Sequence, residues 1–195
     1  MPIIAGRASA AVGAGFSRVV AAAYAGPFGA FDSLASVTVP TGGVSSIYFG
    51  GIPTGYKHLE IRGAGRGTYA GSGLSMTMNL NDITNASTGY RHHIYASGSG
   101  SVSAYAASYY GTIGGTPGAN VTANIFGGIA MSILDYANTS KTKTLRYFNG
   151  YDANGSGEVI FGSSYTPVTA AITSIELIID GTWAAGSKLA LYGVK

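Results

Sequence analysis

The sequence contains no cysteine in 195 residues. This absence excludes disulfide bonds, thiolate metal sites and cysteine nucleophiles together, and it is compatible with synthesis in a reducing cytoplasm. Charged residues are also scarce, at 10% against a usual fraction of about 25%. Because the hydrophobic content is 46%, the low charge does not indicate disorder, which combines low hydropathy with high net charge.

The few charges carry little information about partners. The net charge is only +3, and the eleven cations are scattered without a run, so the sequence shows no nucleic-acid footprint. No apolar run approaches the about 18 residues needed to cross a bilayer, and we expect no membrane partner. Surfaces with so few charges are often covered by neighbouring subunits, which favours an oligomer.

Alternation of apolar and polar residues with a period of two is the dominant pattern. It predicts strands, each with one buried face, at 58–62, 74–80, 129–133, 143–147, 175–179 and 188–192. Further strands are expected at 36–39, 44–49, 90–96, 121–126 and 158–162. Turn residues separate these runs, and no long amphipathic helix is evident. The sequence therefore predicts an all-β fold over 36–195, an antiparallel β-sandwich whose strand count favours a jelly roll.

Residues 1–35 differ from the rest and are rich in alanine and glycine. A short helix around 17–25 is compatible with this composition, and nearby glycines limit its length. Such a segment cannot form its own core, so it must lie on the following domain or on a partner chain. We interpret it as an extended N-terminal anchoring arm with five apolar contact residues at irregular spacing: Ile3, Ile4, Phe16, Phe28 and Phe31.

The segment 97–120 is rich in glycine, serine and tyrosine and is predicted to be a long loop. It carries Tyr105, Tyr109 and Tyr110, and tyrosine gives a large contact area at low entropic cost. With Trp183, which lies between strands, these tyrosines are candidates for stacking on sugar rings. The favoured alternative is core packing for Trp183 and subunit contacts for the tyrosines.

Two motifs resemble ligand loops but are better explained as turns. Residues 62–67 resemble a phosphate-binding glycine loop, but a strand follows where the mechanism requires a helix N-terminus. Residues 152–157 resemble the first half of a calcium loop, but the twelfth position holds Ser163 instead of the bidentate glutamate. A glycine-rich hairpin connection and a polar turn are therefore the favoured interpretations.

The sequence shows no catalytic or metal constellation. Of its three histidines, His92 and His93 point to opposite faces of a strand, and a structural role is favoured for them and for His58. We expect no metal and no cofactor. No GxSxG nucleophile elbow is present. Glu176 and Asp180 share one strand but lie about 13 Å apart along it, too far for a glycosidase pair. The protein is therefore not expected to be an enzyme. The alternative that carboxylates from different strands converge in one catalytic site stays open.

Several segments together resemble a pattern in structural proteins of tailed-bacteriophage virions, including those of cyanobacterial phages. The resemblance covers 36–96 and 170–195, and it is carried by the residues 45–49, 52–62, 80–82, 90–93, 172–177 and 185–195. Such proteins are tail-fibre, baseplate, tail-tip or head-decoration components, typically β-sandwiches and often trimers. The matching motifs are strands and turns, so the resemblance implies fold and context and brings no catalytic residues.

The resemblance implies a virion structural protein, located in the virion. Its arm would attach it to other virion proteins, and its sandwich would assemble as a homotrimer. The alternative is a receptor-binding module that recognises host surface glycan through the tyrosines of 97–120 and Trp183. A third interpretation, a depolymerase, requires at least two acids that converge in one groove.

Overall fold

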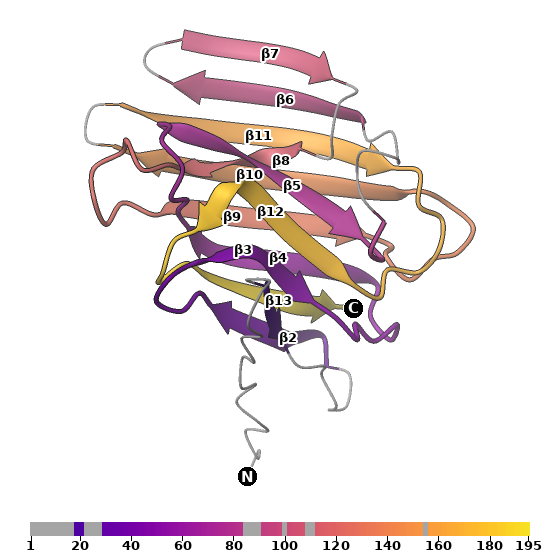
Figure 1. Cartoon of the computed structure of the whole chain (residues 1–195). Helices are drawn as coiled ribbons and strands as arrows, with labels where there is room; N and C mark the ends of the chain where they lie inside the picture. Colours follow the sequence, from indigo (N-terminus) through magenta and orange to yellow (C-terminus); the bar gives the residue numbers. More distant parts are fainter. Residues whose placement is uncertain (1–17, 22–28, 84–90, 99–100, 108–111, 154–155) are drawn as a thin grey trace.

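The computed structural model of the chain describes residues 18–21, 29–83, 91–98, 101–107, 112–153 and 156–195 (Figure 1). Within these ranges the chain forms 13 β-strands and no helix. Consequently, the described residues include no helix that is long and apolar enough to span a membrane.

The strands form two sheets. The five-stranded sheet has the order β1 (Arg18–Ala21), β3 (Val44–Phe49), β12 (Ile175–Trp183), β5 (Gly73–Leu80) and β8 (Thr112–Pro117). The eight-stranded sheet has the order β2 (Phe31–Thr38), β13 (Lys188–Val194), β4 (His58–Gly65), β9 (Gly127–Leu134), β10 (Lys143–Asp152), β11 (Gly157–Thr166), β6 (Arg91–Gly98) and β7 (Ser101–Ala107). Neighbouring strands are antiparallel except β1 and β3, which are parallel.

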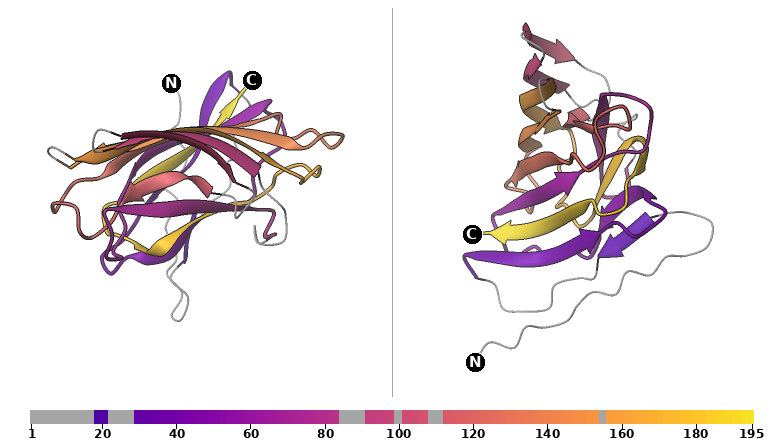
Figure 2. Two further views of the ribbon diagram at one scale, coloured as in Figure 1. Left: turned by 90° about the horizontal axis from the view of Figure 1, so that it is seen from above. Right: turned by 90° about the vertical axis from the view of Figure 1, so that its left-hand side faces the viewer.

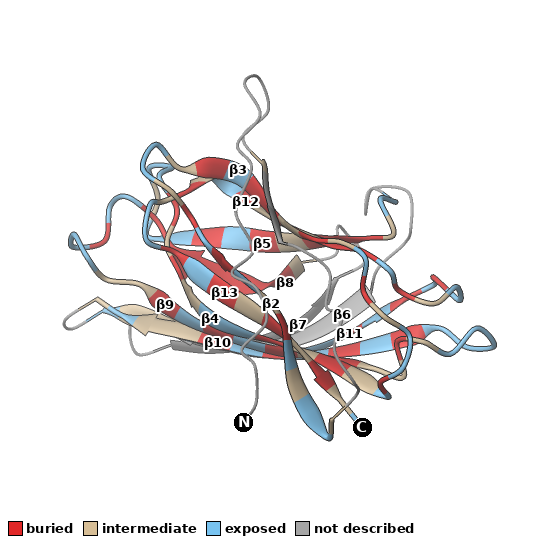
Figure 3. Ribbon diagram, turned by 90° about the horizontal axis from the view of Figure 1, so that it is seen from below, coloured by how far each residue is buried: buried red, intermediate tan, exposed pale blue. Residues whose placement is uncertain are grey.

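The two sheets pack against each other as layers around one core (Figure 2). Buried and exposed residues alternate along the strands, as the period of two predicts (Figure 3). In β5, for example, Leu74, Met76 and Met78 are at most 3% exposed. Burial of each such side chain stabilises the fold by about 1.5–3 kcal/mol. The all-β sandwich is confirmed, whereas the jelly-roll arrangement, two sheets with eight strands in total, is not.

The predicted loop at 97–120 is wrong, because it contains β7 and β8. β7 consists mostly of serine and alanine and shows little apolar alternation, so its sequence carries a weak strand signal. β8 is equally unusual because Gly114 has a φ of 104°. A Cβ at that position would lie 1.8 Å from Nδ2 of the buried Asn149, so only glycine permits the strand to pack there.

The predicted strand at 121–126 is also wrong, because this segment forms turns and irregular structure. The guanidinium group of Arg66 holds it in place. Its Nη1 donates hydrogen bonds to the carbonyl oxygens of Thr122 and Ile125, both at 2.9 Å, and its Nη2 donates to Val121 at 2.7 Å. These carbonyls are satisfied by one side chain and need no strand partner.

The sheets begin earlier in the chain than residue 36. Arg18–Ala21 forms β1 instead of part of a helix at 17–25, and residues 31–35 belong to β2. Phe31 is 47% exposed, and its ring stacks on Tyr192 with centroids 5.0 Å apart. The other four predicted anchoring residues, Ile3, Ile4, Phe16 and Phe28, lie outside the described residues.

The β6–β7 hairpin extends the larger sheet beyond the smaller one (Figures 1 and 2). β6 pairs with β11 along its length, and β7 forms the outer edge of the sheet. An edge strand presents backbone groups that a further strand can pair with.

Candidate functional site

A cleft with a volume of about 650 Å³ lies where β5 and β8 of the smaller sheet meet β10 and β11 of the larger one. Its polar lining residues are Ser72, Ser75, Thr112, Asn120, Thr122, Tyr151, Ser156 and Glu158. Glycines on β5, β8 and β11 line the same space and keep its walls free of bulky side chains. The volume lies within the range of about 300–1,000 Å³ that is typical of small-molecule sites.

Glu158 is the one ionisable carboxyl group among the lining residues. It is half-buried, and this burial raises its pKa above the ordinary value of 4.5. Tyr151 lies directly opposite on β10, and burial, together with the charge of Glu158, raises the pKa of its phenol. A Cβ on Gly73 would lie 3.2 Å from both the Glu158 Oε2 and the Tyr151 hydroxyl oxygen. The glycine therefore leaves the two groups accessible from the cleft.

One wall of the cleft is built from the segment that Arg66 holds. Asn120, Val121 and Thr122 line the cleft, and the guanidinium group fixes the backbone around them. Gly65 is required for core packing, because a Cβ there would lie 2.5 Å from Trp183 Cζ3. The glycine-rich residues 62–67 thus act in packing and loop positioning. The predicted hairpin connection is wrong, because residues 62–65 belong to β4 and the next strand, β5, lies in the other sheet.

Two other acids of the smaller sheet form hydrogen bonds outside the cleft. Glu176 accepts hydrogen bonds from Ser46 Oγ at 2.7 Å and Asn79 Nδ2 at 3.0 Å. Asp180 accepts one from the backbone N–H of Ser75 at 3.2 Å. Among the described residues, the cleft is lined by one carboxyl group, that of Glu158, whereas most glycoside hydrolases use a pair.

A second surface region lies on the other face of β10 and β11. Its exposed members are Phe148, Val159, Phe161 and Tyr165, with exposed fractions of 54%, 44%, 57% and 39%, and we call this group the outer aromatic face. Phe148 and Phe161 are directly opposite each other in the strand register. A shallow groove of about 590 Å³ beside them is lined by Arg62, Ala130 and Val159, among others.

The residues proposed for sugar stacking do not form one surface among the described residues. Trp183 is fully buried, and its Nε1–H donates a hydrogen bond to the Leu177 carbonyl at 3.2 Å. This is the core-packing role considered as its alternative. Tyr105 occupies a position in β7 opposite Ile94, and only its backbone is described. Tyr109 and Tyr110 lie outside the described residues.

Neither a cleft around Glu158 nor the outer aromatic face was expected from the sequence. A signal for the outer face was available, because Phe148 and Phe161 stand in the polar phase of two alternating strands. Apolar residues in that phase indicate a contact surface. Glu158 offered no comparable signal, since its partner wall comes from strands far away in the sequence.

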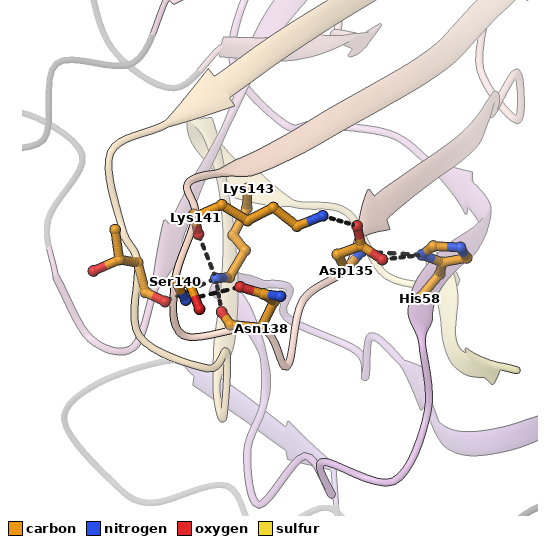
Figure 4. A network of polar contacts seen from close by, with 7 residues as sticks. His58, Asp135, Asn138, Ser140, Lys141 and Lys143 are labelled. Carbon is orange, nitrogen blue, oxygen red and sulfur yellow. Dashed lines mark hydrogen bonds and ion pairs between the residues drawn. The ribbon is translucent and has the colours of Figure 1, made fainter.

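His58 has a structural role, as predicted (Figure 4). Its Nδ1 accepts a hydrogen bond from the backbone N–H of Asp135 at 3.0 Å. The Asp135 carboxylate pairs with Lys141 Nζ at 2.5 Å, and this hydrogen bond lowers the pKa of Asp135. His92 and His93 lie in β6, where only the backbone is described. In the part of the chain that the structure describes, no group of three or more His, Asp or Glu residues is arranged to hold a metal ion.

Lys143 is fully buried next to this network (Figure 4). Its ammonium group donates hydrogen bonds to the carbonyl oxygens of Lys141 at 3.0 Å and Thr169 at 2.9 Å, and also to that of Asn138. Burial lowers the pKa of Lys143. The side chain therefore ties the β9–β10 turn to the segment that follows β11.

Comparison of the chain with protein-family models, with curated proteins and with solved structures finds no match.

Proposed function

We propose that the protein is a structural subunit of a tailed-bacteriophage virion, which assembles with copies of itself as a homotrimer through the outer aromatic face. The observation that carries the assembly role is the exposure of Phe148 and Phe161 side by side on a strand pair, at 54% and 57%. The proposal includes no catalytic step and no cofactor.

The energetic reason for assembly is the apolar area of this face. Removing apolar surface from water contributes about 25 cal/mol per Å², and monomers seldom expose contiguous apolar patches above a few hundred Å². Val159 and Tyr165 lengthen the patch along β11, and the β6–β7 hairpin continues the sheet beside it. A second copy of the chain is a suitable occupant because it can pack aromatic rings against Phe148 and Phe161. It can also pair opposite charges with Arg146 and Asp152, which are exposed in the same phase of β10.

The virion context depends on the sequence resemblance over 36–96 and 170–195. In this proposal the residues before β1 attach the subunit to other virion proteins. The parallel pairing of β1 with β3 supports this arrangement, because it joins the N-terminal segment to the sandwich at one edge of the smaller sheet.

The assembly role is tested by light scattering coupled to size-exclusion chromatography. We expect the full chain to have about three times the mass of the 19.7 kDa protomer. The double variant Phe148→Ser/Phe161→Ser should be monomeric with unchanged circular dichroism. Phe31→Ser is the matched control, since it removes an exposed phenylalanine from the edge strand β2 of the same sheet, away from β10 and β11. A wild-type monomer, or a double variant that keeps its mass, contradicts the assembly role.

The attachment role is tested separately by deleting residues 2–17, which leaves β1 intact. The truncated protein should remain folded and oligomeric but should not be incorporated into purified phage particles. Normal incorporation of the truncated protein would contradict attachment through this segment.

A further inference from the structure

The cleft between β5, β8, β10 and β11 combines an uncompensated carboxyl group with walls that carry hydroxyl groups. The side-chain carboxyl group of Glu158 has no hydrogen-bond partner among the described residues, and no lysine or arginine is among the described residues that line the cleft. A partly desolvated carboxylate without a partner is costly. A ligand that donates hydrogen bonds to it would remove part of that cost, and charge-assisted hydrogen bonds are the stronger kind.

The lining restricts the chemistry of this ligand. An anion would be repelled by Glu158, since the cleft offers no cation to offset that charge. An apolar ligand would leave the hydroxyl groups of Ser72, Ser75 and Thr112 without partners. A compound with many hydroxyl groups fits both conditions, because serine, threonine and asparagine side chains both donate and accept hydrogen bonds.

Tyr151 supplies the second element of such a site. It lines the cleft opposite Glu158 on the neighbouring strand. Its aromatic ring offers an apolar surface, and its hydroxyl group offers a hydrogen-bonding partner. A sugar ring has the same combination of apolar C–H faces and polar edges.

We propose that this cleft binds a neutral oligosaccharide, with Glu158 accepting hydrogen bonds from sugar hydroxyl groups and Tyr151 packing against a sugar ring. The cleft differs from the glycan surface expected from the sequence, which relied on Trp183 and the tyrosines of 97–120. Glu158 and Val159 lie in opposite phases of β11, and only Val159 belongs to the outer aromatic face. The two proposals can therefore be tested with substitutions at different residues.

The geometry of the glycines supports access to the carboxyl group. A Cβ on Gly115 would lie 3.6 Å from Glu158 Oε2, and one on Gly73 would lie 3.2 Å from it. Any larger residue at these positions on β8 and β5 would occupy the space in front of the carboxylate. The two strands thus keep a passage to Glu158.

The test uses the full-length protein on a printed array of neutral, anionic and amine-bearing glycans, followed by calorimetric titration with the neutral oligosaccharide retained best. Two variants probe the site. Thr122→Trp places a bulky ring at the exposed rim of the cleft, and it spares the contact with Arg66, which involves the backbone carbonyl. Glu158→Gln keeps the side-chain shape and removes the charge. The matched control is Glu60→Gln, since Glu60 lies on β4 and pairs with Arg62.

We expect the wild type to retain neutral glycans and to discriminate against anionic ones. Thr122→Trp should abolish this binding, Glu158→Gln should weaken it about tenfold, and Glu60→Gln should leave it unchanged. The proposal is overturned if the wild type retains no neutral glycan, if it retains only anionic or only amine-bearing ones, or if Thr122→Trp binds like the wild type. These outcomes are distinct from loss of the oligomer, which is measured by mass.

Discussion

The inner face of the β10–β11 strand pair contains buried polar side chains, whereas its outer face leaves aromatic side chains exposed to solvent. The inner face buries polar side chains together with apolar ones, and both Lys143 and Asn149 are fully buried there. The outer face exposes two phenylalanines, Phe148 and Phe161. Polarity therefore does not by itself decide which face of this strand pair is covered. The Lys143 ammonium group and the Asn149 Nδ2 are tolerated inside because they donate hydrogen bonds to backbone carbonyl oxygens, and the outer aromatic residues are those expected where a partner packs.

The largest difference in stability between the two faces is expected when an apolar side chain is removed from the inner face. Leu145 is fully buried between the sheets, so Leu145→Ala should lower the free energy of unfolding by about 2–5 kcal/mol through lost transfer energy and a cavity. Phe161→Ala, on the outer face, should change it by about 0.5 kcal/mol or less under conditions where the chain is monomeric. Urea unfolding at a fixed protein concentration measures both. Equal losses would contradict the assignment of the two faces.

A smaller but still large effect is expected for Lys143. Lys143→Ala removes the donor for the carbonyl oxygens of Lys141, Thr169 and Asn138. Each hydrogen bond to a charged group contributes about 1.5–3 kcal/mol, and partial access of water to the freed carbonyls should limit the total loss to about 2–3 kcal/mol. Thr144→Ala, its exposed neighbour, is the control. Chemical denaturation that finds the two variants equally stable would show that the buried ammonium group does not hold these segments together.

Gly162 leaves space on the inner face for the ring of Tyr147. A Cβ at this position would lie 2.2 Å from Tyr147 Cζ, inside the ring that packs across the strand pair. Gly162→Ala should therefore destabilise the protein by about 1–3 kcal/mol, the usual cost of overpacking a core. Gly128→Ala is a matched control, because its Cβ would meet no atom closer than 3.9 Å. Thermal unfolding compares the two. A Gly162→Ala protein with unchanged melting temperature would contradict the observed packing of Tyr147.

The smallest effect concerns Glu158 and pH. Burial raises the pKa of this carboxyl in the folded state above its ordinary value of 4.5. The unfolded chain then releases the proton more readily, so the contribution of Glu158 to stability is fully present below pH 4.5 and is lost as the pH rises through the folded-state pKa.

Glu158→Gln cannot ionise, and it should therefore be slightly more stable than the wild type at neutral pH. The difference should shrink as the pH falls toward 4.5. Denaturant midpoints of both proteins, measured across this pH range, check the sign. A variant that is less stable at neutral pH would show that the carboxylate is stabilised by its surroundings.

Strands with clear alternation were predictable from sequence, because successive side chains point to opposite faces. The runs at 74–80 and 143–147 both form strands with the expected face buried. The alternation rule also fits Lys143, which the structure buries in the same phase as Leu145 although its side chain is charged. It failed at β7 and β8, where serine, alanine and glycine give no alternation and pairing with neighbouring strands decides the conformation.

The cleft could not be predicted in the same way. Glu158 follows a polar turn, and its sequence neighbours do not reveal what faces it. Gly73 and Gly115 leave the passage to its carboxylate, and both come from strands distant in sequence. Arg66 shapes the opposite wall through carbonyl groups about 55 residues further along the chain.

The sequence by itself determined that this protein is built from strands with one buried face, because a period of two admits no other regular structure. It also determined that no thiol chemistry takes part, since the chain has no cysteine. Only the tertiary structure decided that Trp183 belongs to the core, that the phenylalanines of β10 and β11 remain outside, and that Glu158 lies in a polar cleft. Burial and accessibility depend on which sheet covers which strand, and that is set by contacts between residues far apart in the chain.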